Sequence, residues 1–176
     1  ILINSFYGYT AFAQGTFNDF GMAAEITGRG RDILASMRDF LLQSGAAIVE
    51  MDTDGIYFTP PDGVTDMDAM RQRVQAILPE GIEIELDASY QAMFCYKSKN
   101  YALLDWEGRI SLTGAALKSR GLEPFQRRYM REHIGLLLTG READADALYE
   151  RYVADLETHR LPLKDFAKRE ILSTSP

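Results

Sequence analysis

Residues 46–58 read AAIVEMDTDGIYF, and this stretch decides which fold the chain is expected to adopt. Two short apolar runs lie on either side of the segment 52–55, DTDG, and aspartate and glycine favour tight turns. The pattern therefore predicts two short strands within residues 46–59 that meet at this turn. Because side chains alternate along a strand, Asp52 and Asp54 are expected on the same side of the chain, a placement that the turn itself would modify.

The two carboxylates admit two interpretations. Ionised carboxylates held close together repel each other unless a cation compensates them, and Mg²⁺ is a hard ion that carboxylates bind together with substrate phosphates. The alternative is structural, because the same residues make a good hairpin turn. An EF-hand loop is excluded, since Ile56 and Tyr57 stand where that loop needs an acidic or amide side chain and then a glycine.

Hydrophobic periodicity on both sides of this stretch predicts further helices and strands. Residues 1–9 are expected to end a helix in a tight Tyr7-Gly8-Tyr9 turn, and Asn18 or Asp19 is expected to cap a long helix that ends at Gly45. Other helices are predicted over residues 66–78, 123–139 and 142–158, and other strands over 82–86, 90–96, 100–105 and 109–113. This mixture favours an α+β fold in which helices cover one face of a sheet.

The composition is that of an ordinary globular domain. The chain has 176 residues, of which 46% are apolar, and a net charge of −7. Its single cysteine, Cys95, excludes an internal disulfide and a cysteine-based zinc site. No apolar run approaches the roughly 18 residues of a membrane span, so no membrane is expected among its partners. The chain lacks an initiator methionine and begins within an apolar pattern, so we expect it to be a segment of a longer protein.

The charge is distributed unevenly. Eight basic and three acidic residues lie between Lys97 and Arg131, which gives this stretch a charge of +5 and the remaining chain a charge of −12. Such asymmetry is typical of a protein that meets a polyanion on one face. A solvated surface with uneven charge is the alternative.

Four motifs, taken in order, resemble those of the family B DNA polymerases. Residues 4–8, NSFYG, are similar to the end of the KxxxNSxYG motif, and the DTDG segment is similar to the DTD(S/G) motif. Residues 99–102, KNYA, resemble the KKxYA motif, and RGLE at 120–123 with Arg127 and Arg128 resembles the RGxExxRR stretch. The four motifs follow the order of the family and extend from the first residues to Arg128.

The resemblance implies an α+β fold with a palm-type antiparallel sheet packed by helices, a long fingers-derived helix and C-terminal helices. Residues 1–45 would be the end of the fingers and the long palm helix. Residues 46–120 would form the palm sheet with the DTD motif and the primer-contacting strands, and residues 121–176 would be the end of the palm and the start of the thumb.

The resemblance also implies roles for individual residues near the reacting groups. Asp54 matches the main metal-binding carboxylate and Asp52 its acidic partner, and both would be catalytic. The implied cofactor is a pair of Mg²⁺ ions, for which Mn²⁺ is a substitute. Asp87 lies fourteen residues before Tyr101, where some members have a third carboxylate; a surface acid at a strand end is the alternative. The residues that would line the pocket for the incoming nucleotide are Asn4, Tyr7 and Gly8.

Residues of the later motifs would contact DNA. Lys99 and Tyr101 match residues that touch the primer near its end, and Lys118, Arg120, Arg127 and Arg128 would meet backbone phosphates. A solvated basic surface is the alternative for Lys118 and Arg128. Two departures affect the details: Glu50 stands where many members have an aromatic residue, and Asn100 replaces a frequent basic residue.

The function that the resemblance implies is template-directed DNA synthesis, in which deoxynucleotides are transferred to a primer 3′-hydroxyl. This chain would be an incomplete part of such an enzyme, inactive alone. The implied partners are primer–template DNA, deoxynucleoside triphosphates and, through the full-length protein, a sliding clamp; the implied location is the cytoplasm of a prokaryote, at the nucleoid. The alternative is a catalytically inactive relative that serves as a DNA-binding or scaffold subunit. The intact Asp52 and Asp54 favour the enzyme.

Overall fold

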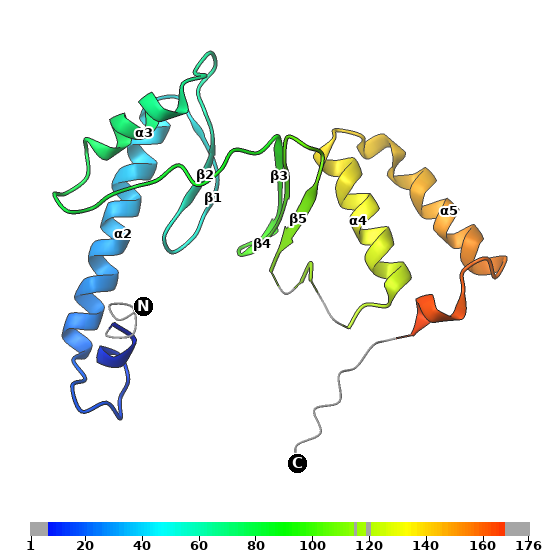
Figure 1. Ribbon diagram of the computed structural model, residues 1–176, viewed down its shortest axis with the longest axis horizontal. Helices are drawn as coiled ribbons and strands as arrows, with labels where there is room; N and C mark the ends of the chain where they lie inside the picture. The colour runs from blue at the N-terminus through cyan, green and yellow to red at the C-terminus, as the bar shows by residue number, and fades with distance from the viewer. Residues whose placement is uncertain (1–6, 115, 119–120, 168–176) are drawn as a thin grey trace. The chain divides into compact units, whose positions relative to one another are not determined.

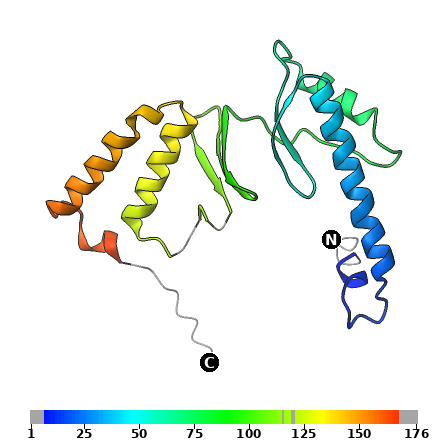
Figure 2. The same cartoon turned by 180° about the vertical axis from the view of Figure 1, so that it is seen from behind.

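A computed structural model describes residues 7–114, 116–118 and 121–167 of the chain (Figures 1 and 2). The chain divides into two compact units, the first ending at Asp87 and the second beginning at Ala88. This boundary falls inside the expected 46–120 segment, and the division into fingers, palm and thumb stays a prediction. No helix within the described ranges has both the length and the apolar character needed to cross a membrane.

The first unit is built around a long helix, α2 (Phe20–Gln43). The helix begins after Asp19, because the Asp19 carboxylate accepts a hydrogen bond of 2.9 Å from the Met22 N–H. It ends at Ser44, and Gly45 then adopts a φ of +90°, the left-handed conformation that commonly closes a helix. The predicted cap and the predicted end of this helix are confirmed.

A two-stranded antiparallel hairpin follows α2. Strand β1 (Ala47–Met51) pairs with β2 (Ile56–Thr59), as the sequence predicts. The next helix, α3 (Met67–Gln75), begins where the Asp66 carboxylate accepts the Ala69 N–H at 2.9 Å. Apolar residues of α2, α3 and the hairpin enclose one core, whose buried members are Leu41, Ala46, Met70 and Val74.

Two sequence-based predictions in this unit are wrong. Residues 82–86 form no strand, because the Gln75 side chain takes the backbone groups that a strand partner would need: its amide donates to the Ile82 carbonyl at 2.6 Å and accepts from the Ile84 N–H at 2.9 Å. The expected Tyr7-Gly8-Tyr9 turn is also wrong, since residues 7–10 are helical and the Ala11 N–H reaches the Tyr7 carbonyl.

The second unit is a three-stranded antiparallel sheet packed against helices. The strands β3 (Ala92–Lys97), β4 (Asn100–Leu104) and β5 (Ile110–Thr113) lie in that order across the sheet. Helix α4 (Pro124–Leu138) packs on it around a core of Ala102, Leu104, Leu117, Ile134 and Leu138. The α+β prediction is confirmed, and the described strands fall into two antiparallel sheets.

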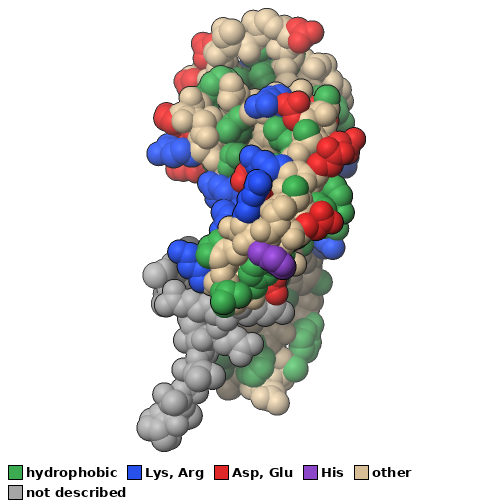
Figure 3. All heavy atoms as spheres, turned by 90° about the vertical axis from the view of Figure 1, so that its right-hand side faces the viewer, with side chains coloured by type: hydrophobic (Ala, Val, Ile, Leu, Met, Phe, Trp, Pro, Cys, Tyr) green, Lys and Arg blue, Asp and Glu red, His purple; other side chains and the backbone are tan. Residues whose placement is uncertain are grey.

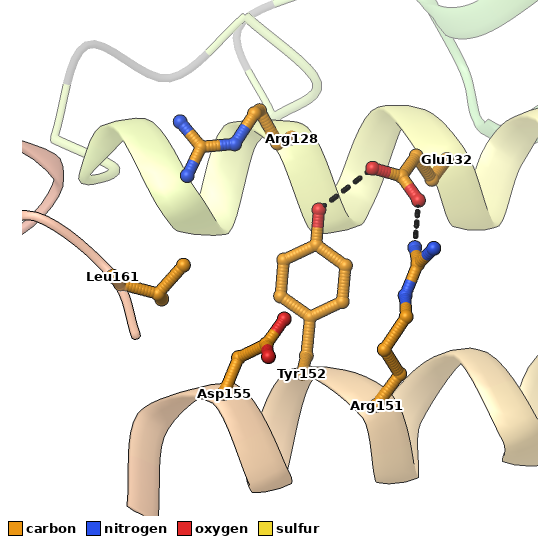
Figure 4. Close-up of a pocket in the computed structure, with 6 residues that line it drawn as sticks. All are labelled: Arg128, Glu132, Arg151, Tyr152, Asp155 and Leu161. Carbon is orange, nitrogen blue, oxygen red and sulfur yellow. Dashed lines mark hydrogen bonds and ion pairs between the residues drawn. The ribbon is translucent and has the colours of Figure 1, made fainter. Parts of the chain in front are cut away.

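A polar network joins α4 to α5 (Ala145–Glu157) and to the short helix η2 (Leu163–Phe166). The Glu132 carboxylate on α4 accepts the Tyr152 hydroxyl at 2.8 Å and pairs with Arg151, both on α5 (Figure 4). Arg128 on α4 donates to the Asp165 carboxylate of η2 at 2.6 Å. Arg128, Glu132, Arg151 and Tyr152 line a cavity of about 190 Å³. Each of these four side chains already has a hydrogen-bond or ion-pair partner.

Two groups of this network have shifted pKa values. The hydrogen bond from Arg128 holds the pKa of the Asp165 carboxyl below its usual value, although the burial of the carboxyl opposes this shift. Burial and the hydrogen bond to Glu132 raise the pKa of the Tyr152 hydroxyl. The first shift makes the second unit sensitive to acid, because a carboxylate whose pKa is lowered by folding stabilises the native state only while it is ionised.

We expect Asp165→Asn to lower the unfolding temperature at neutral pH and to reduce its acid dependence. The ion pair with Arg128 contributes fully above the ordinary carboxyl pKa of 3.8 and is lost as the pH falls through the lower pKa of the folded state. Thermal unfolding followed by circular dichroism, at neutral pH and at a series of pH values below about 4, measures both effects. Glu150→Gln, at an exposed position on α5, is the control; equal pH profiles for Asp165→Asn and wild type would contradict the expectation.

Gly114 and Gly108 give a second test of the packing in this unit. Both have a positive φ, +95° and +80°, but a Cβ at Gly114 would overlap the Lys99 carbonyl oxygen and Asn100 Oδ1, whereas a Cβ at Gly108 meets nothing within 4 Å. We expect Gly108→Ala to cost about 1 kcal/mol of unfolding free energy and Gly114→Ala about 3 kcal/mol or more. Urea unfolding of the two variants measures the difference, and equal destabilisation would rule out the close approach at Gly114.

Candidate functional site

The predicted pair of carboxylates lies on the turn between β1 and β2. The Asp52 N–H donates to the Gly55 carbonyl at 3.0 Å and closes the turn. The Asp52 carboxylate accepts hydrogen bonds from the N–H and the hydroxyl of Thr53, at 2.7 and 3.1 Å. Asp52 is half-buried and Asp54 is exposed. The turn therefore fixes the first carboxylate and presents the second to solvent.

A groove of about 730 Å³ lies between α2 and this turn. Most of its exposed lining is apolar, with Ile26, Leu34 and Met51 among the contributors. Tyr7 lines it as well, so the structure brings Tyr7 and Asp52 to one cavity although 45 positions separate them in the sequence. Gly8 is described but does not line the groove, and Asn4 lies outside the described residues.

Two arginines for which the sequence predicted no role also line the groove. Arg31 and Arg38 are seven positions apart on α2, with Leu34 between them on the same face. A spacing of three or four residues repeats along one side of a helix, so helical periodicity was the signal that could have found them. The groove thus combines apolar walls with two guanidinium groups and the Asp52 carboxylate.

The donor set suits part of a magnesium site. Carboxylate oxygens are the hard ligands that Mg²⁺ takes, and Asp52 and Asp54 supply them from a single turn. Within the described ranges, however, no three His, Cys, Asp or Glu side chains are grouped so that they could hold an ion. Asp87, exposed in the irregular segment after α3, therefore does not join the other two here, and its role as a metal ligand stays a prediction.

Three of the predicted DNA-contacting residues lie at one end of the three-stranded sheet. Lys99 occupies the β3–β4 turn with a φ of +60°, and Tyr101 on β4 pairs with Cys95 and with Thr113. The Lys118 N–H donates to the Gly114 carbonyl, directly after β5, at 3.0 Å. Both lysine side chains are exposed and Tyr101 is half-buried. The structure therefore brings these three residues together, whereas Arg120 lies outside the described residues.

The adjacent arginines of α4 have different surroundings. Arg127 is exposed, and its side chain makes no hydrogen bond or ion pair with any residue that the structure describes. Arg128 is paired with Asp165, as described above. Figure 3 shows basic side chains gathered on one part of the face that it presents, with acidic side chains around them. The surface is therefore mixed in charge rather than uniformly basic.

Comparison with known proteins places the chain in a family. The model of DNA polymerase family B matches residues 1–175. The DNA polymerase of Pyrococcus horikoshii is 32% identical over 124 residues, which are 66% of this chain and 10% of that relative. DNA polymerase 1 of Pyrococcus abyssi is 32% identical over 126 residues, which are 68% of this chain and 16% of the relative.

A solved structure agrees with these matches in fold. The family B DNA polymerase from the hyperthermophilic archaeon Pyrobaculum calidifontis superimposes with a TM-score of 0.72 at 23% identity, over 92% of this chain and 21% of that one. The chain thus spans about a fifth or less of the length of these three proteins. The match to the family model extends through both compact units and includes the turn that carries Asp52 and Asp54, and the chain therefore belongs to DNA polymerase family B.

Proposed function

We propose that the chain is the part of a template-directed DNA polymerase that carries catalytic carboxylates and contacts the primer strand. The observation that supports this most is the β1–β2 turn, which holds Asp52 and Asp54 beside a groove lined by Tyr7. The reaction is attack of the primer 3′-hydroxyl on the α-phosphate of a deoxynucleoside triphosphate, with pyrophosphate as the leaving group.

Asp54 and Asp52 would hold the metal ions of this reaction. Two Mg²⁺ ions, or Mn²⁺ in their place, supply activation of the 3′-hydroxyl and stabilisation of the leaving pyrophosphate when they are bound. The chain positions these groups: the two Thr53 hydrogen bonds orient the Asp52 carboxylate, and the turn exposes Asp54 to solvent. Further ligands would come from the substrate phosphates and from residues beyond this pair.

The groove suits the sugar and base of a nucleotide. Its apolar residues offer surface to the uncharged parts of the ligand, and Tyr7 offers a ring beside them. Arg31 and Arg38 provide guanidinium groups for phosphates, of which that of Arg38 is also bonded to the Asp39 carboxylate at 2.7 Å. Asn4 and Gly8 stay predicted contributors to this pocket.

Sequence-independent DNA contacts are proposed for the second unit. Lys99, Lys118 and Arg127 are exposed cations suited to backbone phosphates, which position a duplex without reading its sequence. Tyr101 would lie against the primer, and Arg120 and Arg128 stay predicted phosphate contacts. A sliding clamp as a partner and a location at the nucleoid are proposals that follow from this function.

We expect Asp54→Asn, in a full-length polymerase that carries this chain, to reduce primer extension by about a thousandfold or more, because a charged group acting in the transition state is removed. Binding of primer–template DNA should stay within about twofold of wild type, since phosphate contacts dominate that affinity. Primer extension with Mg²⁺ and four deoxynucleotides, beside a fluorescence-anisotropy titration, measures both quantities.

Asp62→Asn is the matched control, because Asp62 is an exposed carboxylate in the loop between β2 and α3. Extension should be normal in that variant. A wild-type protein that binds primer–template without extending it would favour the inactive DNA-binding relative instead.

The 176-residue chain alone is expected to catalyse no templated extension. The described residues offer two carboxylates at one turn and no group of three, so Mg²⁺ should bind weakly. Isothermal titration with Mg²⁺ and a primer-extension assay on the isolated chain test this. Robust extension by the chain itself would show that a complete site is present.

A further inference from the structure

The side chain of Asn100, the first residue of β4, ties together two backbone segments that are distant in the sequence. Its Nδ2 donates to the Ser98 carbonyl in the β3–β4 turn at 2.9 Å. Its Oδ1 accepts the Ala116 N–H, beyond the end of β5, also at 2.9 Å. One half-buried amide therefore uses its donor and its acceptor to join the turn to the segment that follows the sheet.

The backbone around this amide is held in a tight arrangement. Lys99 has a φ of +60°, an unusual conformation for a residue other than glycine. Gly114 has a φ of +95° and lies so close to the Lys99 carbonyl and to Asn100 Oδ1 that no side chain would fit there. Such conformations persist where surrounding contacts enforce them, and the Asn100 amide supplies two of these contacts.

This arrangement links two exposed lysines. Lys99 precedes Asn100 directly, and the Lys118 N–H is bonded to the carbonyl of Gly114, which in turn lies against Lys99. The two lysines are nineteen positions apart in the sequence, yet their backbones belong to one connected set of contacts. Removal of the Asn100 amide would therefore loosen the backbone at both lysines.

We propose that Asn100 is a positioning residue that fixes Lys99 and Lys118 as a pair for contact with the phosphates of the primer strand. The proposal rests on the DNA contacts of the proposed function. The chemistry explains why an amide stands here: a lysine or arginine side chain would add charge but has no acceptor for the Ala116 N–H. Asn100 thus carries no charge to the phosphates itself and instead fixes the backbone positions of Lys99 and Lys118.

The chain contains a matched control in the other compact unit. Gln75 is also an amide that joins two backbone groups, donating to the Ile82 carbonyl at 2.6 Å and accepting from the Ile84 N–H at 2.9 Å. Removing it should disturb local structure to a similar degree. None of the predicted DNA-contacting residues belongs to its segment, so its replacement should leave the salt dependence of DNA binding unchanged.

The experiment is a salt titration of DNA binding by the 176-residue chain, with a fluorescein-labelled primer–template duplex as the probe. The slope of log K against log salt concentration changes by about 0.9 for each phosphate that the protein no longer neutralises. We expect Asn100→Ala to reduce the magnitude of this slope by about 1 to 2, and Lys118→Ala to reduce it by about 1. Gln75→Ala should keep the wild-type slope.

A double-mutant cycle separates positioning from general damage to the fold. If Asn100 acts through the lysines, Asn100→Ala should change the slope by less than about 0.3 in a Lys99→Ala/Lys118→Ala background, because the lysine side chains that it positions are already absent. General damage to the fold would instead change the slope by a similar amount in the wild-type and in the Lys99→Ala/Lys118→Ala background. Circular dichroism confirms folding, and Asn100→Ser, whose hydroxyl is too short to bridge both backbone groups, replaces the alanine variant if that one does not fold.

The outcomes distinguish this inference from the proposed function. An unchanged slope in a folded Asn100 variant, with salt-dependent binding by the wild type, overturns the positioning role alone. No binding by the wild-type chain contradicts the proposed DNA contacts and overturns the positioning role with them. A reduced slope that vanishes in the double-lysine background supports the inference.

Discussion

A two-stranded hairpin is at best marginally stable in water, so the β1–β2 hairpin depends on the helices that cover it. The buried side chains Leu41 on α2 and Met70 on α3 provide that cover, together with Ala46 at the start of the hairpin. The hairpin can therefore keep polar, mutually repelling groups at its turn, because the opposite end of the strands is anchored. The position of Asp52 and Asp54 follows from this division between a buried base and a solvent-facing tip.

The sheet of the second unit also depends on a helix that covers it, although this sheet has three strands and the helix is α4. The buried core residues Ala102 and Leu104 of β4 pack against Ile134 and Leu138 of α4. The chemistry proposed for this unit again lies at an end of the sheet, where Lys99 and Lys118 are exposed. In both units the helices stabilise the strands, and the side chains with proposed functions lie at the ends of the strands.

Local signals in the sequence were sufficient for most of the fold. The Asp19 cap, the helix that follows Asp66, the paired strands β1 and β2 and the Asp52–Asp54 turn all depend on residues close to one another in the chain, and the sequence predicted each of them. Residues 82–86 alternate between apolar and polar side chains as a strand does, but they form no strand. This alternation cannot show that the Gln75 side chain bonds to their backbone.

The parts of the candidate site that escaped prediction depend on contacts between distant segments. Arg31 and Arg38 line a groove only because α2 lies beside the β1–β2 turn. The proposed role of Asn100 depends on Ala116, sixteen positions later, and no spacing rule relates an amide to such a partner. The sequence shows only that Asn100 stands where relatives often have a basic residue. The structure shows that its side-chain amide makes two hydrogen bonds to the backbone.

The ion pairs of the second unit weaken the long-range electric field of the basic stretch between Lys97 and Arg131. Arg109 is held by Asp105 and Glu107, and Arg128 by Asp165. Arg109 and Arg128 therefore contribute less than their formal charge to the electric field that reaches a polyanion before contact. Fewer effective charges mean weaker long-range attraction, and at physiological salt this attraction fades over about 8 Å. If this surface binds DNA as proposed, short-range encounter should govern the binding rate, with diffusional steering important only at low ionic strength.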